Sequence, residues 1–487
     1  MEQANAIELK NITKRFGEVV ANDSVDLSVK HGEILSVLGE NGSGKTTLMN
    51  MISGIYFPDE GQIFVDGEEV SICSPKDSFA LGIGMIHQHF KLVDVLTAAE
   101  NIILGLEGKS VLDMKKVVQD IQEVTERYGF ELDPNQKIYD MSVSQKQTVE
   151  IVKMLYRGAN ILILDEPTAV LTPQETEKLF TVLRNMRDQG KSIIIITHKL
   201  NEVLALSDRV SVLRKGKYIG TVETKNATAE SLTEMMVGEK IDLNIERPDP
   251  VNPVKRLVIE NLSCVNKEGV KTLKNASMEA YGGEILGIAG IAGSGQKELL
   301  EAVAGLQMTE SGSVRYITED GEEKELLSMK PADIKKLGVA LSFVPEDRLG
   351  MGLVGSMGMT GNMMLRGYNE GRGIFANRKE PKELAEKIVD QLQVSTPSVN
   401  TPVSRLSGGN VQKVLVGREI SADPTVLMVA YPVRGLDINS SLTIYDLLNE
   451  QKKRGVAVIC VGEDLDVLLE LCDKILVLCG GKITGVV

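Results

Sequence analysis

Short apolar runs recur along the chain, and helical stretches separate them. The runs expected to be strands are residues 34–38, 161–164 and 192–197 in the first half and 285–289, 426–429 and 456–461 in the second. Because these runs are apolar on both faces, they predict strands of a buried, mostly parallel sheet. The charged stretch 114–128 has helical spacing and predicts a helix on an outer subdomain. The order of strand, glycine-rich loop, helix, long insertion, strand and helix predicts an α/β fold.

This order of elements occurs twice. Residues 39–47 read GENGSGKTT, and residues 290–298, which lie 251 positions later, read GIAGSGQKE. Further along the shift becomes 265, which relates Ser142 to Ser407. Constant shifts over such lengths predict a duplicated domain. The expected parts are a domain over residues 1–240, a polar, proline-bearing linker over 241–256 and a second domain over 257–487.

The composition and charge are those of a globular protein that does not bind nucleic acid. Of the 487 residues, 43% are hydrophobic and 25% charged, and the formal net charge is −14. Nucleic acid and anionic lipid both carry negative charge, so an acidic chain suits neither. The first residues lack the apolar core of a signal peptide, and no apolar run reaches the roughly 18 residues of a membrane-spanning helix. The five cysteines show no CxxC pair and no metal-ligand spacing, which favours reduced thiols in a cytosolic protein.

The first glycine-rich loop carries a nucleotide-binding motif. Residues 39–46 fit G-x-x-x-x-G-K-[ST] and lie between a predicted strand and a predicted helix, as this motif requires. The glycines let backbone N–H groups surround phosphates, and Lys45 supplies a positive charge for the β- and γ-phosphates of ATP. Thr46 supplies a hydroxyl for Mg²⁺. The residues expected to bind nucleotide here are Gly39, Asn41, Gly42, Ser43, Gly44, Lys45, Thr46 and Thr47.

Two more apolar runs end in residues suited to phosphate chemistry. The run 161–164 leads to Asp165, expected to hold Mg²⁺, and to Glu166, expected to polarise the attacking water as a general base. Taken alone, this stretch also fits a strand that enters a turn, but the upstream loop favours the catalytic interpretation. The run 192–197 leads to His198. A lone histidine is more often structural, but this one follows a strand at the sheet edge where ligands bind in such folds.

Together these motifs resemble the nucleotide-binding subunits of ABC transporters over almost the whole chain. In that resemblance Gln88 in IHQHF is the Q-loop glutamine, Phe16 in KRFG is the aromatic that stacks on adenine, and His198 is the switch histidine. The resemblance implies ATP and Mg²⁺ as cofactors. It places Lys45, Gln88, Glu166 and His198 in catalysis and Thr46, Gln88 and Asp165 at the metal. It also implies two tandem P-loop ATPase domains, each with a mostly parallel sheet core, an antiparallel β subdomain and a helical subdomain.

The second copy has lost the residues that this chemistry needs. The replacements are Gln296 for Lys45, Lys297 for Thr46, Ala430 for Asp165, Tyr431 for Glu166 and Glu463 for His198, with Glu346 near the place of the Q-loop glutamine. No aromatic residue lies in 264–269, where a counterpart of Phe16 would stand. A site without its base, its Mg²⁺ ligand and its P-loop lysine is not expected to hydrolyse ATP.

The second copy nevertheless keeps an ABC signature that the first copy has lost. Residues 406–410 read LSGGN, whereas 141–145 read MSVSQ, and Asp437 has Thr172 as its counterpart. In the family two domains pair head to tail, and each ATP lies between one P-loop and the other domain's signature. The resemblance therefore completes the first P-loop with Ser407, Gly408, Gly409, Asn410 and Asp437, and leaves the second P-loop in a degenerate site. Because the losses in both halves fall on the same side, we expect the halves to pair inside one chain.

The resemblance implies the ATPase subunit of a bacterial ABC importer, peripheral on the cytoplasmic face of the cell membrane. Its partners would be two transmembrane permease subunits and an extracellular or periplasmic substrate-binding protein, without nucleic acid. The segments IHQHF, LTAAENIILG and SFVPEDR look most like the nucleoside-importer branch, and ribose- or galactose-type importers are the alternative. A soluble tandem ABC ATPase that acts on ribosomes is the competing class. The inactive second site, the short linker and the acidic charge count against it.

Three features keep two interpretations each. His87 and His89 could line the γ-phosphate region or be solvated loop residues. Residues 90–100 could receive a helix of a membrane subunit or belong to the core of the helical subdomain. The Gly- and Met-rich residues 351–365 could form a second docking groove or a flexible loop. The sequence names neither the transported molecule nor the nucleotide content of the second site.

Overall fold

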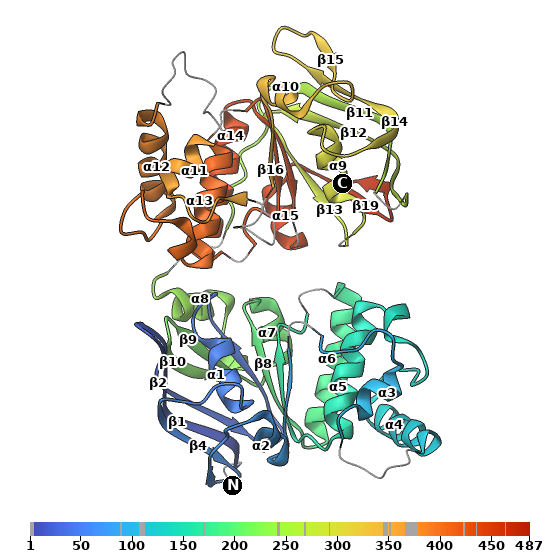
Figure 1. Cartoon of the computed structure of the whole chain (residues 1–487), viewed down its shortest axis with the longest axis vertical. Coiled ribbons are helices and arrows are strands. Elements are labelled where there is room, and N and C mark those ends of the chain that lie inside the picture. Colours follow the sequence, from blue (N-terminus) through green and yellow to red (C-terminus); the bar gives the residue numbers. More distant parts are fainter. Residues whose placement is uncertain are drawn as a thin grey trace. The chain divides into compact units, whose positions relative to one another are not determined.

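The chain folds into two compact units, Met1–Asp242 and Leu243–Val487 (Figure 1). The computed structural model describes residues 4–87, 90–106, 113–168, 171–240, 244–266, 269–291, 293–343, 349, 352–365, 377–421, 424–434, 436–462 and 464–487. Each unit contains a four-stranded antiparallel sheet, a six-stranded mostly parallel sheet and a group of helices. The predicted fold class is confirmed in both units.

The six-stranded sheet of the first unit has the order β10-β9-β3-β8-β7-β6, and the four-stranded sheet has the order β2-β1-β4-β5. The strands are β1 (Asn5–Phe16), β2 (Val19–Lys30), β3 (Ile34–Leu38), β4 (Glu60–Val65), β5 (Glu68–Val70), β6 (Ile83–Ile86), β7 (Ile161–Asp165), β8 (Ser192–Thr197), β9 (Arg209–Arg214) and β10 (Lys217–Glu223). All pairs in the six-stranded sheet are parallel except that of β9 with β10. Every residue of β3, β7 and β8 is buried, because both faces of this sheet are covered.

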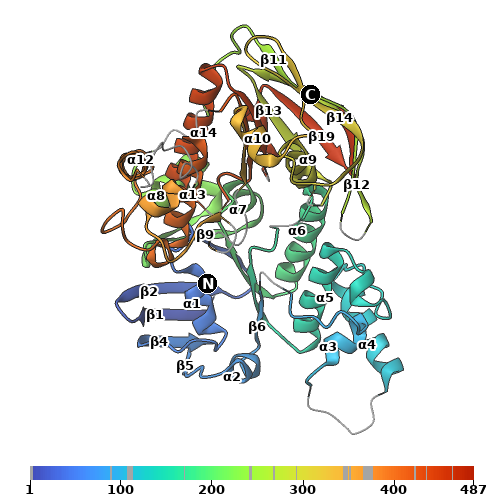
Figure 2. The same cartoon turned by 45° about the horizontal axis from the view of Figure 1, so that its top comes forward.

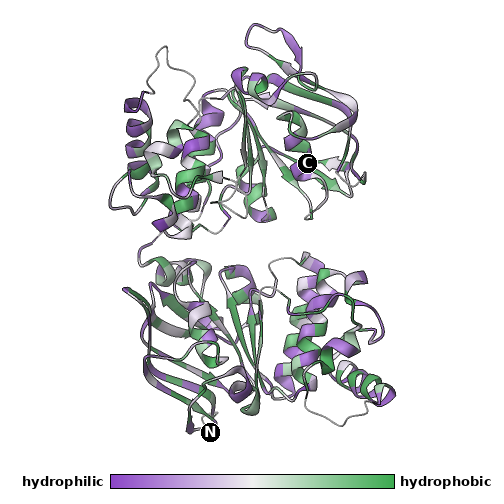
Figure 3. Cartoon of the chain, viewed as in Figure 1, coloured by the Kyte–Doolittle hydropathy of each residue, from purple (hydrophilic) through white to green (hydrophobic). Residues whose placement is uncertain are grey.

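Helices α5 and α6 cover the face of the six-stranded sheet opposite the four-stranded sheet, whereas α1 lies between the two sheets (Figures 1 and 2). The helices are α1 (Lys45–Ile52), α2 (Pro75–Ala80), α3 (Ala98–Ile103), α4 (Met114–Tyr128), α5 (Val143–Tyr156), α6 (Pro173–Asp188), α7 (Leu200–Leu206) and α8 (Ala229–Val237), with short 3-10 helices η1 (Ile138–Asp140) and η2 (Thr224–Asn226). The predicted helix over 114–128 is confirmed. It buries Val117, Ile121 and Tyr128 and turns charged residues outward (Figure 3).

Three hydrophobic clusters hold the described part of the first unit together. One fills the space between the two sheets and includes α1, which carries the glycine-rich loop at its start. The second lies between the other face of the six-stranded sheet and helices α5 and α6. The third joins α3, α4 and α5 in the helical subdomain. The loops at the carboxyl ends of β3, β7 and β8 therefore stand on a packed scaffold.

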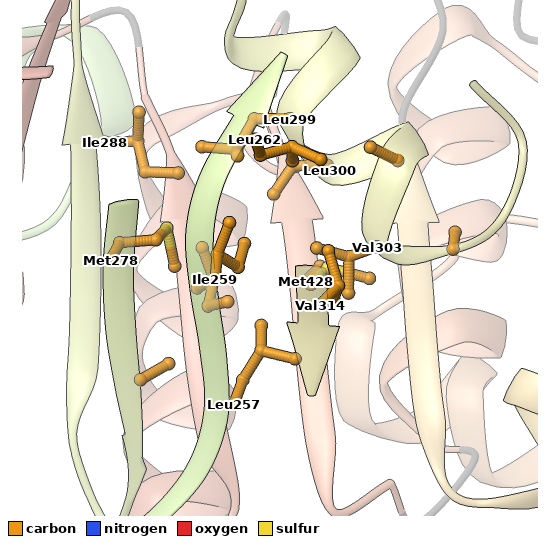
Figure 4. Close-up of a cluster of buried hydrophobic side chains, with 14 of the residues drawn as sticks. Leu257, Ile259, Leu262, Met278, Ile288, Leu299, Leu300, Val303, Val314 and Met428 are labelled. Atoms are coloured by element: carbon orange, nitrogen blue, oxygen red, sulfur yellow. The ribbon is translucent and has the colours of Figure 1, made fainter. Parts of the chain in front are cut away.

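The second unit repeats this plan. Its six-stranded sheet has the order β16-β17-β18-β13-β19-β20, which matches the first unit strand by strand. The strands are β11 (Val254–Val265), β12 (Lys271–Gly282), β13 (Ile285–Ala289), β14 (Thr309–Ile317), β15 (Glu323–Glu325), β16 (Val339–Phe343), β17 (Val426–Ala430), β18 (Ala457–Val461), β19 (Lys474–Cys479) and β20 (Lys482–Val486). The helices are α9 (Gln296–Val303), α10 (Pro331–Lys336), α11 (Met359–Met364), α12 (Lys379–Leu392), α13 (Gly408–Ile420), α14 (Ile438–Lys453) and α15 (Leu465–Leu471), with the 3-10 helix η4 (Val403–Arg405). Figure 4 shows the core between its two sheets, where Leu299 and Val303 of α9 pack near Ile259 of β11 and Met428 of β17.

The connector between the units is anchored to the second unit. Asn449 donates a hydrogen bond of 2.7 Å to the carbonyl of Glu246, and Lys452 donates one to the carbonyl of Pro248. Arg247 donates hydrogen bonds to two carbonyls at the end of α15, that of Leu469 at 3.1 Å and that of Cys472 at 2.7 Å. Strand β11 begins at Val254, inside the segment assigned to the linker from the sequence. Among the described residues, no helix has both the length and the apolar character that crossing a membrane requires.

Candidate active site

The glycine-rich loop of the first unit joins β3 to α1 and needs its glycines. Gly42 and Gly44 have φ values of 82° and 96°, in the left-handed region that favours glycine. A Cβ on Gly39 would lie 2.3 Å from the carbonyl oxygen of Leu213, and one on Gly44 would lie 2.4 Å from that of Ala21. The loop thus wraps tightly around the N-terminus of α1, an arrangement that binds phosphate through backbone N–H groups.

Lys45 lies inside this loop. Its Nζ donates hydrogen bonds of 2.7 Å to the carbonyl of Gly39 and 2.9 Å to that of Glu40. Burial lowers the pKa of Lys45 to about 8, although the charges of Glu166, Asp165 and Glu40 act in the opposite direction. An ammonium withdrawn from water is stabilised by nearby negative charge, so the loop favours an anion such as a phosphate. Ser43 adds a buried hydroxyl that has no hydrogen-bond partner within the described structure.

Asp165 ends β7 and faces the first turn of α1. The hydroxyl of Thr46 donates to Asp165 Oδ2 at 3.4 Å. Burial, and then the charge of Glu166, raises the pKa of Asp165 to about 6. A Mg²⁺ ion would relieve this repulsion, and the hydroxyl and carboxylate oxygens are the hard ligands that it prefers. No group of three or more His, Cys, Asp or Glu side chains among the described residues could hold a metal, so Mg²⁺ here would need phosphate oxygens as further ligands.

Glu166 and His198 form the other side of the first site. His198 follows β8, and its Nδ1 lies 3.0 Å from Glu166 Oε1. This hydrogen bond holds the pKa of Glu166 below its usual range, so the carboxylate is ionised at neutral pH and can accept a hydrogen bond from water. Glu166 has a φ of 47°, and its backbone N–H donates to the carbonyl of Ile196 in β8 at 2.9 Å. The backbone therefore fixes Glu166 beside the strand that presents His198.

A second polar network joins the two segments and was missed in the sequence. Thr168 Oγ1 donates to Glu202 Oε2 at 2.5 Å, and Lys199 Nζ donates to Glu202 Oε1 at 2.9 Å. Thr168 lies two positions after Glu166, and Glu202 lies in α7 shortly after His198, so the network joins the two segments that carry the site residues. The polar residues beside both motifs, in LDEPT and THKLNE, were the only indication in the sequence.

The other predicted nucleotide contacts lie around the loop. Phe16 ends β1, and the β1–β2 hairpin contacts the loop through Asn22, whose Nδ2 donates to the carbonyl of Gly44 at 3.2 Å. Asn41 is exposed and Thr47 is half-buried. Gln88 lies outside the described residues, as do His89, Glu346 and Glu463.

The second glycine-rich loop keeps its backbone but not its charge. Gly293 and Gly295 have φ values of 81° and 106°, matching Gly42 and Gly44. Gln296 takes the position of Lys45, and its Nε2 donates to the carbonyl of Ile291 at 3.0 Å. Ala430 ends β17 and Tyr431 follows it, where the first unit has its two carboxylates. The second unit therefore presents a neutral loop and no carboxylate at these positions.

The retained signature begins a helix of the second unit. Ser407 caps α13 and accepts hydrogen bonds from the backbone N–H of Asn410 at 3.4 Å and its Nδ2 at 2.9 Å. A Cβ on Gly409 would meet no atom within 4 Å. Among the described residues of the unit, nothing requires glycine at this position, so its small size leaves the helix N-terminus open to a ligand. In the first copy Ser142 caps α5 in the same way, but Val143 and Ser144 stand in place of Gly408 and Gly409, and Val143 is exposed.

Asp437 caps α14 in the second unit. Its Oδ1 accepts hydrogen bonds from the backbone N–H of Ser440 at 2.8 Å and from its hydroxyl at 2.6 Å. Thr172, its counterpart, caps α6 in the first unit. Of the predicted site residues, the first unit brings together Lys45, Thr46, Asp165, Glu166 and His198, whereas 407–410 and Asp437 belong to the second unit.

This fold and site define a P-loop ATPase domain that occurs twice in one chain. The ABC transporter family model matches residues 22–169 and 273–432. The chain is 42% identical over 492 residues to the nucleoside import ATP-binding protein NupA of Lactococcus lactis, covering 100% of this chain and 96% of that protein. It is 42% identical over 483 residues to the guanosine import ATP-binding protein NupO of Bacillus subtilis (98% and 93% covered) and 35% identical over 491 residues to the galactose/methyl galactoside import ATP-binding protein MglA of Clostridium perfringens (100% and 93%).

Among solved structures, an archaeal ribosome recycling factor in complex with a ribosomal stalk protein aligns with 97% of this chain and 88% of its own length. The TM-score is 0.62 at 16% identity, a likeness that concerns the fold alone. The chain belongs to the ABC transporter family. It is a tandem ATP-binding subunit of that family and an ATPase.

Proposed function

We propose that this chain is the ATP-hydrolysing subunit of an ABC importer that carries nucleosides. It works at the cytoplasmic face of the membrane with two permease subunits and a substrate-binding protein. The relatives named for nucleoside and guanosine import, each 42% identical over nearly the whole chain, support this substrate class. The galactose-import relative, at 35% identity, makes a ribose- or galactose-type importer the second candidate.

The observation that carries the ATPase assignment is the Glu166–His198 pair beside Lys45 and Asp165. Lys45 and the loop N–H groups hold the β- and γ-phosphates, and Phe16 stacks on the base. Glu166 accepts a proton from the attacking water, and His198 keeps Glu166 ionised and oriented. Thr46, Asp165 and, by resemblance, Gln88 would hold Mg²⁺, which supplies positive charge to the phosphates when bound.

The two units divide the work unequally in this proposal. The first domain, residues 1–240, supplies the catalytic P-loop, and the linker 241–256 leads to the second domain, 257–487. The signature 407–410 and Asp437 of the second domain complete the first site, while Gln296, Ala430 and Tyr431 leave the other site without hydrolysis. Binding of ATP closes the domains on each other and hydrolysis reopens them, which drives alternating access in the permease.

The test is co-purification of the chain from native membranes solubilised in mild detergent, followed by mass spectrometry. Two polytopic membrane proteins and a substrate-binding protein are expected. That binding protein is then screened against nucleosides and pentoses by thermal shift, because a ligand raises the stability of the protein that binds it. Stabilisation by pentoses alone would replace the nucleoside assignment with the sugar one. Ribosomal proteins without a membrane partner would refute the importer.

A further inference from the structure

Two exposed aromatic rings meet at the end of strand β1 in the first unit. Phe16, at the end of β1, and Tyr56, which follows α1, pack edge to face with ring centroids 5.2 Å apart and an interplanar angle of 72°. The two residues are 44% and 38% exposed. A pair this open adds little to the hydrophobic core, since its rings keep much of their surface in water. The contact joins the end of the P-loop helix to the hairpin that carries the predicted base-stacking residue.

Asp59 fastens the same two segments together. Its carboxylate accepts a hydrogen bond of 2.9 Å from Lys14 Nζ and one of 2.6 Å from the backbone N–H of Arg15. Its own N–H donates to the carbonyl of Thr13 at 2.8 Å. Lys14 Nζ also lies 5.6 Å from the centroid of the Phe16 ring. Asp59 thus holds the backbone next to Phe16 in place, and Tyr56 packs against the Phe16 ring.

The second unit joins the equivalent segments without rings. At the repeat shift of 251, Tyr56 corresponds to Gln307. Gln307 Nε2 donates to the carbonyl of Val265 at the end of β11, at 2.6 Å. In the second unit an amide side chain therefore makes the contact between these segments that an aromatic ring makes in the first. The two rings therefore occur together: the first unit has both Tyr56 and Phe16, and the second unit has an aromatic residue at neither position.

We propose that Tyr56 is a positioning residue for ATP, which holds the Phe16 ring in the orientation that stacks on the nucleobase. The inference rests on the proposed function, in which Phe16 contacts the base. A ring fixed before binding loses less conformational freedom when the base arrives, which strengthens binding. Tyr56 therefore acts on the base of ATP and not on its phosphates, and it raises affinity without entering the hydrolytic step.

The experiment compares the full chain with its Tyr56→Gln variant, which installs the residue of the second unit and its capacity to bond the hairpin backbone. The measured quantities are KM and kcat for ATP and the inhibition constant of inorganic tripolyphosphate, which has phosphates but no base. We expect KM for ATP to rise about threefold to tenfold, the range for loss of an aromatic pair. We expect kcat to stay within about twofold and the tripolyphosphate constant to stay unchanged.

Three further variants complete the design. Tyr56→Phe keeps the ring and should behave as the unaltered chain, and so should Phe57→Ala, which removes the exposed neighbouring ring. Phe16→Ala should raise KM for ATP by itself. Adding Tyr56→Gln to Phe16→Ala should raise KM no further, because a residue that acts through Phe16 has no effect once that ring is gone.

Several results would overturn the proposal. KM could remain unchanged in Tyr56→Gln while Phe16→Ala raises it, which would remove Tyr56 alone from base recognition. An equal loss of tripolyphosphate affinity would show that Tyr56 supports the phosphate loop instead. If Phe16→Ala left KM for ATP unchanged, base stacking by Phe16 would be wrong, and the proposal on Tyr56 would fall with it.

Discussion

Lys452→Met should destabilise the second unit far more than Arg187→Met destabilises the first. The two residues occupy equivalent positions of the repeat at the shift of 265, and each pairs with an equivalent aspartate, Asp473 or Asp208. Each aspartate also accepts a hydrogen bond from the first backbone N–H of a central strand, at 2.7 Å in β13 and 2.8 Å in β3. The chain therefore contains its own control for the energetic effect of burial.

The magnitude follows from the exposure of the two pairs. The Lys452 and Asp473 side chains are 2% and 7% exposed, whereas those of Arg187 and Asp208 are 27% and 39% exposed. Removing one member of a buried pair costs about 3–5 kcal/mol because a charge is left buried, whereas an exposed pair contributes about 0–1 kcal/mol. In the variant, the Ile285 N–H of β13 still donates a hydrogen bond to the buried Asp473 carboxylate. We therefore expect a loss of stability at the lower end of the range for buried pairs, about 3 kcal/mol. Lys452→Met also removes the hydrogen bond to Pro248, so the connector loses an anchor.

Native-state hydrogen exchange with mass spectrometry separates the two units, because each amide reports the opening of its own cooperative region. In Lys452→Met, protection of β19 peptides should fall about 100-fold, and that of β9 peptides should not change. In Arg187→Met, protection of β9 should fall less than about fivefold. Methionine keeps most of the apolar stem in both variants, so packing changes little. Equal losses in the two variants, or unchanged protection of β19 in Lys452→Met, would refute the argument from burial.

Three further predictions concern the ATPase sites. Glu166→Gln should lower ATP turnover at least about 100-fold, because the variant lacks the proposed general base. A fluorescent ATP analogue should still bind, and substantial residual turnover would contradict the role of Glu166. Gln296→Lys should leave turnover unchanged because Ala430 and Tyr431 remain, and a doubled rate in a phosphate-release assay would show that the second site had been misjudged. Gly408→Val, which copies the first unit's Val143, should lower turnover at least about tenfold by closing the signature, while the control Val143→Gly should not; wild-type turnover in Gly408→Val would count against pairing of the two units.

Much of the fold followed from hydrophobic runs and spacing, but strand ends depended on pairing. The expected strand 161–164 extends to Asp165, because Asp165 pairs with Ile196 of β8. Strand β11 begins before the expected start of the second domain, because Val254 and Lys255 pair with the end of β12. Where a strand begins and ends depends on its pairing with a neighbouring strand, and the local sequence pattern carries no information about that neighbour.

The site shows the same division. Lys45, Asp165 and His198 could be placed together in advance because parallel strands bring their carboxyl ends to one edge of a sheet. The contacts of Thr168 with Glu202 and of Phe16 with Tyr56 could not, since each joins a loop to an element far away in the chain. Loop conformation decides such contacts, and it is set by tertiary packing and not by periodicity.

The turn that follows β7 has the same backbone conformation as the turn that follows β17, although the second unit has Ala430 and Tyr431 where the first has Asp165 and Glu166. Glu166 and Tyr431 have φ values of 47° and 54°, a conformation that costs about 1–3 kcal/mol in a residue other than glycine. The backbone N–H of each residue donates a hydrogen bond of 2.9 Å to a carbonyl of the adjacent strand, Glu166 to Ile196 and Tyr431 to Val461.

An equivalent amide contact supports this turn in both units. Gln147 of α5 donates to the carbonyl of Pro167 at 2.7 Å, and Gln412 of α13 donates to that of Pro432 at 3.2 Å. The strained turn thus persists at Tyr431, where no carboxylate needs it. A strand carbonyl and a helix glutamine hold this conformation in both units, so it does not depend on a carboxylate side chain. The second unit, which has Gln296, Ala430 and Tyr431 where the first has Lys45, Asp165 and Glu166, therefore keeps the backbone of this region and the helix that carries residues 407–410.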